Sequence, residues 1–113
     1  MVFLFKDFHV EPILRGEKTQ TRRRHKRPRR VGSVHQCRTT LFGKPFARIR
    51  IKRVWRERVC DINDADAEAE GGYTREEYIR GLLEMHRGRL SETDWVWCYE
   101  FELVEACGRV GNG

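Results

Sequence analysis

A short polar motif near the start of the chain contains the side chains best suited to chemistry. It reads Gly16-x-Lys18-x-x-Thr21-x-Arg23 and directly follows the apolar pair Ile13-Leu14. A threonine hydroxyl becomes a good nucleophile only when a base removes its proton. A lysine can be that base when burial or neighbouring cations lower its pKa, and several arginines follow Lys18 closely. The motif therefore has residue types for recognising a polar ligand and for acyl transfer.

A cluster of acids lies far along the chain, in the segment 61–70, which we expect to be a short helix stopped by glycines. Its last acid, Glu70, can orient a water, move a proton or accept a hydrogen bond from an exocyclic amine. Arg23 can hold a phosphate or a base oxygen, or pair with an acid of this helix. A purely structural interpretation is also open. In it, Lys18 and Glu70 form an ion pair between loop and helix, and Thr21 satisfies backbone groups of the turn.

The motif opens a dense cationic run. From Arg15 to Arg30 there are nine Lys or Arg and one acid, a net charge of +8, against +6 for the whole chain. Charge this concentrated favours polyanions, nucleic acid above all. A predicted strand at 46–54 adds a second basic surface, which is either an ordinary solvated face or a contact for phosphates. The residues that we predict to bind nucleic acid are Lys18, Arg22, Arg23, Arg24, Lys26, Arg27, Arg29, Arg30, Arg48, Arg50 and Lys52.

The charge is uneven along the chain. Residues 15–58 contain seventeen Lys or Arg and two acids, a net +15, whereas residues 59–113 contain five and thirteen, a net −8. We expect part of the acidic half to neutralise its basic neighbour. The rest would keep polyanions away from the wrong face.

The composition narrows the class of protein. A chain of 113 residues, 39% of them hydrophobic, is enough for one domain with a real core that needs no metal or disulfide. The four cysteines lack the spacing of a zinc site, so we expect reduced thiols and neither metal nor cofactor. No apolar run approaches the roughly 18 residues of a membrane span, and the start lacks the features of a signal peptide. We therefore expect a cytoplasmic protein with no membrane partner.

Local patterns predict the elements that must position the motif. We expect strands at 2–5, 31–38, 46–54 and 95–104, helices at 9–16, 61–70 and 74–85, and a loop at 17–30. In the last strand, one face carries Trp95, Trp97, Tyr99, Phe101 and Leu103, and we expect the other to be partly solvated. Strands without regular helix alternation favour an α+β fold, a small and mostly antiparallel β-barrel decorated with short helices.

The motif resembles the signature of ASCH domains, members of the PUA-like superfamily, whose usual pattern is G-x-K-x-x-E/T-x-R. Four landmarks agree in order: Ile13-Leu14, Gly32, Glu70-Gly71 and the aromatic strand from Trp95. The resemblance covers about residues 2–104. It implies a PUA-like β-barrel in an ASCH domain at 1–105, a cleft beside the motif, and RNA binding. Residues 106–113 are rich in glycine, and we expect them to form a flexible tail.

One branch of this family looks like a set of small amidohydrolases that deacylate N4-acetylcytidine. Lys18, Thr21 and Glu70 fall on the catalytic positions of that branch, and threonine at position 21 matches it. The resemblance thus gives two hypotheses. The first is an RNA- or nucleotide-binding domain with a cationic cleft at the motif, and the alternative is an amidohydrolase acting on N4-acetylcytidine-type nucleosides. The basic run at 22–30 favours a polymer ligand, whereas Thr21 favours the enzyme.

Overall fold

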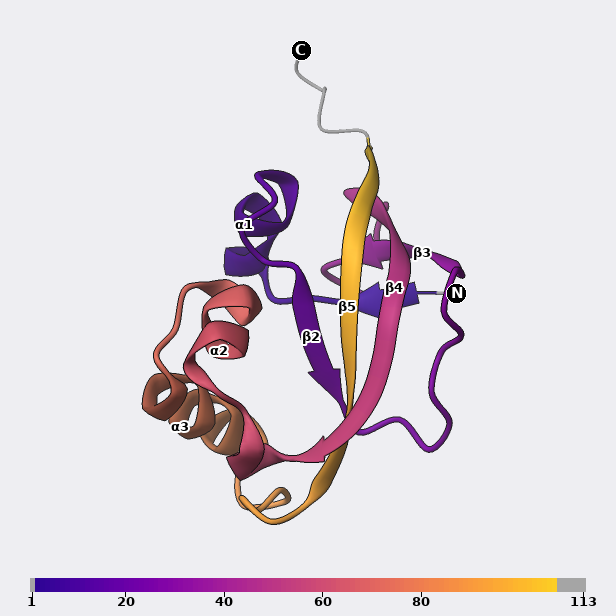
Figure 1. Ribbon diagram of the computed structural model, residues 1–113. Helices are drawn as coiled ribbons and strands as arrows, with labels where there is room; N and C mark the ends of the chain where they lie inside the picture. The colour runs from indigo at the N-terminus through magenta and orange to yellow at the C-terminus, as the bar shows by residue number, and fades with distance from the viewer. Residues whose placement is uncertain (1, 108–113) are drawn as a thin grey trace.

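The computed structural model describes residues 2–107, which form one five-stranded sheet with helices packed against it (Figure 1). The strands are β1 (Val2–Leu4), β2 (Gln20–Arg23), β3 (Val34–Arg38), β4 (Ala47–Arg58) and β5 (Trp95–Ala106). Their order is β1-β3-β4-β5-β2, with β1 parallel to β3 and the other neighbours antiparallel. The α+β, mostly antiparallel prediction is confirmed. The sheet is open, with β1 and β2 as its edges, so a closed barrel is not confirmed.

The helices begin and end where local signals place them. They are α1 (Val10–Leu14), α2 (Asp64–Gly71) and α3 (Arg75–Met85), with short 3-10 turns η1 (Asp7–His9) and η2 (Val59–Asp61). The Asn63 side chain caps α2 by accepting from the Asp66 N–H at 2.7 Å. At α3, Thr74 and Glu77 form the predicted capping box. The acidic helix stops at the glycine pair as predicted, but it begins at Asp64 and not at Asp61, because Val59–Asp61 form η2 and Asn63 caps the helix.

The motif glycine ends α1. Gly16 has a φ of +77°, its N–H donates to the Ile13 carbonyl at 3.1 Å, and the Glu17 N–H donates to the Pro12 carbonyl at 2.8 Å. These two bonds are those of a Schellman cap, which needs left-handed backbone after the helix. Gly16 therefore reverses the chain into the motif, as the sequence predicted.

The prediction of a loop over 17–30 is wrong for four residues, because Gln20–Arg23 form β2 and pair with β5. Gln20, Thr21 and Arg22 are polar yet buried. Burial of polar side chains that find partners elsewhere in the fold removes the apolar alternation by which a strand is recognised. The sequence of β2 therefore looked like loop.

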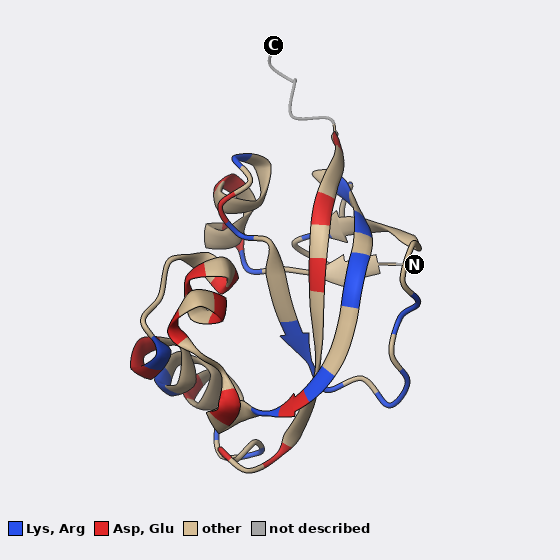
Figure 2. Cartoon of the chain, viewed as in Figure 1, with Lys and Arg blue, Asp and Glu red and all other residues tan. Residues whose placement is uncertain are grey.

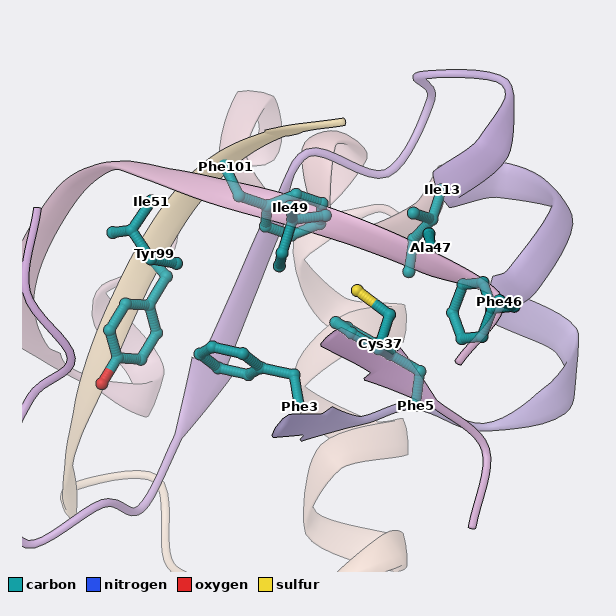
Figure 3. Close-up of a cluster of buried hydrophobic side chains, with 10 residues drawn as sticks. All are labelled: Phe3, Phe5, Ile13, Cys37, Phe46, Ala47, Ile49, Ile51, Tyr99 and Phe101. Atoms are coloured by element: carbon teal, nitrogen blue, oxygen red, sulfur yellow. The ribbon is translucent and has the colours of Figure 1, made fainter. Parts of the chain in front are cut away.

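Two hydrophobic cores lie on opposite faces of the long β4–β5 pair. Core 1 contains Phe3, Phe5, Ile13, Cys37, Phe46, Ala47, Ile49, Ile51, Tyr99 and Phe101 (Figure 3). Core 2 lies against α2 and α3 and contains Val59, Ile62, Ala67, Tyr78, Ile79, Leu82, Leu90, Val96 and Cys98. The alternation of Ile49 and Ile51 with exposed basic residues is confirmed.

The second face of β5 is partly solvated, as predicted, with Glu100 half-buried and Glu102 exposed. Val96 and Cys98 are 2% and 0% exposed because α3 covers their end of that face, whereas Trp95 at 48% and Leu103 at 38% are exposed. The strand therefore contributes to two cores, one on each face. All four cysteines are free thiols.

Cations and acids interleave on the β4–β5 pair (Figure 2). Three ion pairs cross it, Arg48–Glu105 at 3.1 Å, Arg50–Glu102 at 3.4 Å and Arg53–Glu100 at 3.3 Å. Part of the acidic half thus neutralises the basic half, as predicted.

Most of the predicted tail, residues 108–113, lies outside the described residues, and Ala106 is the last residue of β5. No helix within residues 2–107 has the length and apolar character to cross a membrane.

Candidate functional site

A cleft of about 440 Å³ lies between β2, the two helices α2 and α3, and the segment that follows β1. Lys18, Thr21, Arg23 and Glu70 all line it. The structure therefore brings the motif and the last acid of the acidic helix to one concave site. Apolar and aromatic side chains make up much of the remaining wall, among them Phe5, Phe8, Tyr73, Tyr78, Leu82 and Met85.

Lys18 is held by the C-terminal end of α2. The Thr19 N–H donates to the Ala69 carbonyl at 2.8 Å, which fixes the motif against that helix end. Lys18 Nζ then donates to the Glu70 carbonyl at 2.6 Å, to Glu70 Oε1 at 3.1 Å and to the Gln20 carbonyl at 3.0 Å. A cation at this end of a helix is favourable. Three acceptors match the three N–H bonds of a charged ammonium group.

Burial lowers the pKa of Lys18. Its side chain is only 2% exposed, which makes the charged ammonium form less favourable. The Glu70 carboxylate opposes the shift, whereas the charges of Arg22 and Arg23 add to it. The net direction is the one that a lysine base requires.

Glu70 is shared between two cations. Its Oε2 accepts from Arg22 Nη1 at 2.8 Å, while Oε1 faces Lys18. Arg22 Nη2 also lies 2.7 Å from Glu57 Oε1 and 3.5 Å from Asp66 Oδ2. Burial alone would lower the pKa of Arg22, but the carboxylates outweigh burial and raise it. Arg22 is therefore the structural centre of the site.

The sequence allowed Arg23 to pair with the acidic helix, but Arg22 makes that contact. Gln20 and Arg22 contact α2, because alternate residues of a strand share a face. A strand prediction for residues 20–23 would have placed Arg22 on the same face as Gln20, and so would have identified Arg22 as the contact with the acidic helix. The structural alternative is thus present in part, since the Lys18–Glu70 ion pair exists.

Arg23 orients the threonine. Its Nε donates to Thr21 Oγ1 at 2.9 Å, and Nη2 donates to the Leu4 carbonyl at 2.8 Å. The guanidinium lies 4.8 Å from the centre of the Phe5 ring, and burial lowers its pKa. A cation on the hydroxyl oxygen favours negative charge there. Within residues 2–107, the hydrogen bonds of Lys18 Nζ go to Gln20 and Glu70, and none goes to Thr21.

An aromatic wall closes the outer side of the cleft. His9 Nε2 lies 3.0 Å from the Tyr73 hydroxyl, and the Phe8 ring packs 4.6 Å from the His9 ring. Burial and the charges of Lys18 and Arg23 lower the pKa of His9 to about 4, so its ring is neutral near pH 7. Gly71 allows this packing, because a Cβ there would lie 2.9 Å from the Tyr73 ring.

The remaining predicted nucleic-acid contacts are spread over two surfaces. Arg24 lines the cleft and is exposed. Lys26, Arg27 and Arg30, in the segment that follows, are also exposed but lie outside the cleft lining. Arg29 is half-buried, with its N–H donating to the Tyr99 hydroxyl at 3.0 Å. The other surface is the exposed face of β4, outside the cleft lining, which carries Arg48, Arg50 and Lys52. Residues 2–107 contain no cluster of side chains suited to a metal ion.

The site is thus a polar cleft beside a G-x-K-x-x-T-x-R motif in an open α+β fold. The family model of the ASCH domain matches residues 3–105. The chain belongs to the ASCH domain family, which confirms the resemblance seen in its sequence. No curated protein matches the chain significantly.

Several solved structures share the fold. A protein from Enterococcus faecalis is 18% identical with a TM-score of 0.77, over 99% of this chain and 80% of that one. An ASCH domain from Lactobacillus crispatus is 21% identical with a TM-score of 0.71, over 92% and 79%. ASCH from Zymomonas mobilis is 13% identical with a TM-score of 0.63, over 93% and 71%. At these identities the likeness concerns the fold.

Proposed function

We propose that this ASCH domain binds RNA, taking one nucleotide into the cleft while the segment 24–30 contacts neighbouring phosphates. The lining of the cleft is the observation that carries the proposal. Buried polar groups of Lys18, Thr21 and Glu70 lie beside flat aromatic side chains, and exposed cations begin at its rim with Arg24. A nucleobase has stacking faces and a polar edge, which such a lining complements.

The polar groups suit the edge of cytosine. Each carboxylate oxygen has two lone pairs, so Glu70 can accept from an exocyclic amine while it keeps Lys18 and Arg22. Thr21 accepts from Arg23, which leaves the hydroxyl proton available for a base acceptor. Arg23 has further N–H donors for a base oxygen. The Watson–Crick edge of cytosine, with one donor and two acceptors, therefore fits these groups better than the acceptor–donor–acceptor edge of uracil.

Titration with cytidine and uridine 5′-monophosphates tests the proposal. We expect cytidine monophosphate to bind more tightly. We expect Thr21→Val to weaken it by about two- to tenfold, the effect of one lost hydrogen bond. Thr93→Val, in an exposed turn, is the matched control. Absence of saturable binding to both nucleotides would overturn the proposal, and so would equal affinities in wild type and Thr21→Val.

A second candidate function, deacylation of N4-acetylcytidine, is favoured by the buried Lys18 with its lowered pKa in the same cleft as Thr21. Neutral Lys18 would take the hydroxyl proton while Thr21 Oγ1 attacks the acetyl carbon. The bond from that carbon to N4 then breaks, the amine leaves with a proton from Lys18, and water releases acetate from the threonine ester. Lys18 must first leave Glu70, to which its protons point.

Incubation of N4-acetylcytidine with wild type and Thr21→Ala tests this second function. Release of cytidine and acetate by the wild type alone supports it. Equal rates in the two proteins, or no release by the wild type, count against it.

A further inference from the structure

A row of alternating arginine and tryptophan side chains lies on the core 1 face of the β4–β5 pair, beyond the end of that core. Arg56 is paired in register with Trp97, and Arg58 with Trp95. The Arg56 guanidinium lies 5.3 Å from the ring centre of Trp95 and 5.6 Å from that of Trp97, and Arg58 lies 5.0 Å from Trp95. We name these four residues the Arg–Trp stripe.

The stripe is exposed and its charge is not neutralised. Trp95 is 48% exposed, and both arginines are exposed. In the part of the chain that the structure describes, neither Arg56 nor Arg58 has a carboxylate in an ion pair. The acid between them, Glu57, is held by Arg22. By contrast, the other three arginines of β4 are paired with β5. The stripe thus combines aromatic surface with unpaired positive charge.

The basic segment 24–30 starts at the cleft and packs on Tyr99, on the face of β5 that carries the stripe. The segment crosses β5 at Tyr99, whose hydroxyl accepts from the Arg29 N–H at 3.0 Å and lies 2.8 Å from His25 Nδ1. Tyr99 is two residues from Trp97 and therefore on the same face of β5. At the other end of the segment, Arg24 lines the cleft. In Figure 2 the segment continues the cationic colour from the tip of β2.

We propose that the Arg–Trp stripe is a second binding site, for the unpaired bases of a single-stranded RNA that also occupies the cleft. This inference rests on the proposed function. Indole rings and arginine planes stack bases of any identity, and unpaired arginines attract the phosphates between them. Bases in a duplex are already stacked, so the stripe selects single strands. The cleft then reads one nucleotide, and the stripe supplies affinity for the strand.

Anisotropy titration of a fluorescein-labelled oligocytidylate of about twelve nucleotides tests the stripe. We expect Trp95→Ala to weaken binding by about 5- to 100-fold, the effect of one lost stacking contact. Trp95→Phe should retain most of the affinity, because a smaller ring still stacks. Both variants change an exposed side chain, and their thermal unfolding midpoints show whether the fold is intact.

A double variant tests the charge. Arg56→Gln with Arg58→Gln should reduce the steepness of the log–log salt dependence by about 1.4, for two lost single-strand phosphate contacts. Lys44→Gln with Arg80→Gln is the matched control. It removes the same charge from exposed sites outside the cleft and the stripe, and should change the slope less.

The outcomes separate this inference from the proposed function. If wild type and stripe variants bind the oligonucleotide equally well, the stripe is overturned and the cleft stands. If polyglutamate displaces the labelled oligonucleotide as well as unlabelled RNA does, the ligand is an acidic protein, and the stripe proposal is also overturned. If the protein binds neither the oligonucleotide nor the mononucleotides, the stripe inference and the proposed function are both overturned. Loss of the oligonucleotide alone, with cytidine monophosphate still bound, supports the stripe.

Discussion

At the scale of single residues, the site depends on a buried acid shared by two cations. Glu70 is 2% exposed, and its two oxygens face Lys18 and Arg22. Such a cluster is stable only while each charge keeps its partners, because a buried charge without a partner costs several kcal/mol. Glu70 therefore has a structural role whichever ligand the cleft takes.

Neutralising Glu70 should destabilise the fold strongly. We expect Glu70→Gln to lower the free energy of unfolding by about 3–5 kcal/mol, because two buried cations then lose their shared acid. Urea denaturation measures the change. Glu17→Gln, which breaks an exposed ion pair with Arg15, is the control and should change little. An unchanged midpoint in Glu70→Gln would contradict the burial of this ion pair.

Acid should destabilise the protein through its histidines. Burial lowers the pKa of His9, His25 and His35 from 6.5 to about 4. Below pH 6.5 the unfolded chain therefore binds protons that the folded chain does not. Stability is fully present above pH 6.5 and falls as the pH drops toward 4.

Urea midpoints at pH 7 and pH 5 measure this loss. His9→Gln should show a smaller difference between the two pH values than the wild type, because one of the titrating rings is gone. An identical difference in variant and wild type would show that His9 titrates normally in the fold.

At the scale of elements, the cap of α3 holds one wall of the cleft. Thr74 Oγ1 accepts from the Glu77 N–H at 3.2 Å, and Glu77 Oε1 accepts from the Thr74 N–H at 2.9 Å. Thr74→Ala removes one of these bonds and should lower the free energy of unfolding by about 1 kcal/mol. Thr93→Ala, which changes an exposed turn, is the control in the same thermal unfolding experiment. A loss no greater than that of the control would show that the cap contributes nothing.

The elements that the sequence predicted are those with local signals. The capping box at Thr74, the glycine after α1 and the alternation along β4 each depend on neighbouring residues only. The strand β2 has no such signal, because Gln20 and Arg22 are stabilised by Asp66, Glu57 and Glu70 from elsewhere in the chain. The motif and the family resemblance pointed to Lys18, Thr21 and Glu70, which line one cleft, whereas the central position of Arg22 required the fold.

At the scale of the whole molecule, the two charged halves are interleaved, and within residues 2–107 cations that form no ion pair gather after β2. If about four to six phosphates are neutralised on a single strand, the log–log slope of RNA affinity against salt should be about −3 to −4. Lys26→Gln with Arg27→Gln should reduce its steepness by about 1.4. A slope near zero in the wild type would exclude binding through phosphates.

The shared strand pair has a consequence for how the molecule comes apart. Tyr99 and Phe101 complete core 1, while Val96 and Cys98 on the same strand complete core 2. Neither core can melt alone, because the strand that leaves one also opens the other. The domain should therefore unfold as a single cooperative unit, with fluorescence and circular dichroism following one transition. A ligand that occupies the cleft would raise the midpoint of that transition for the entire chain.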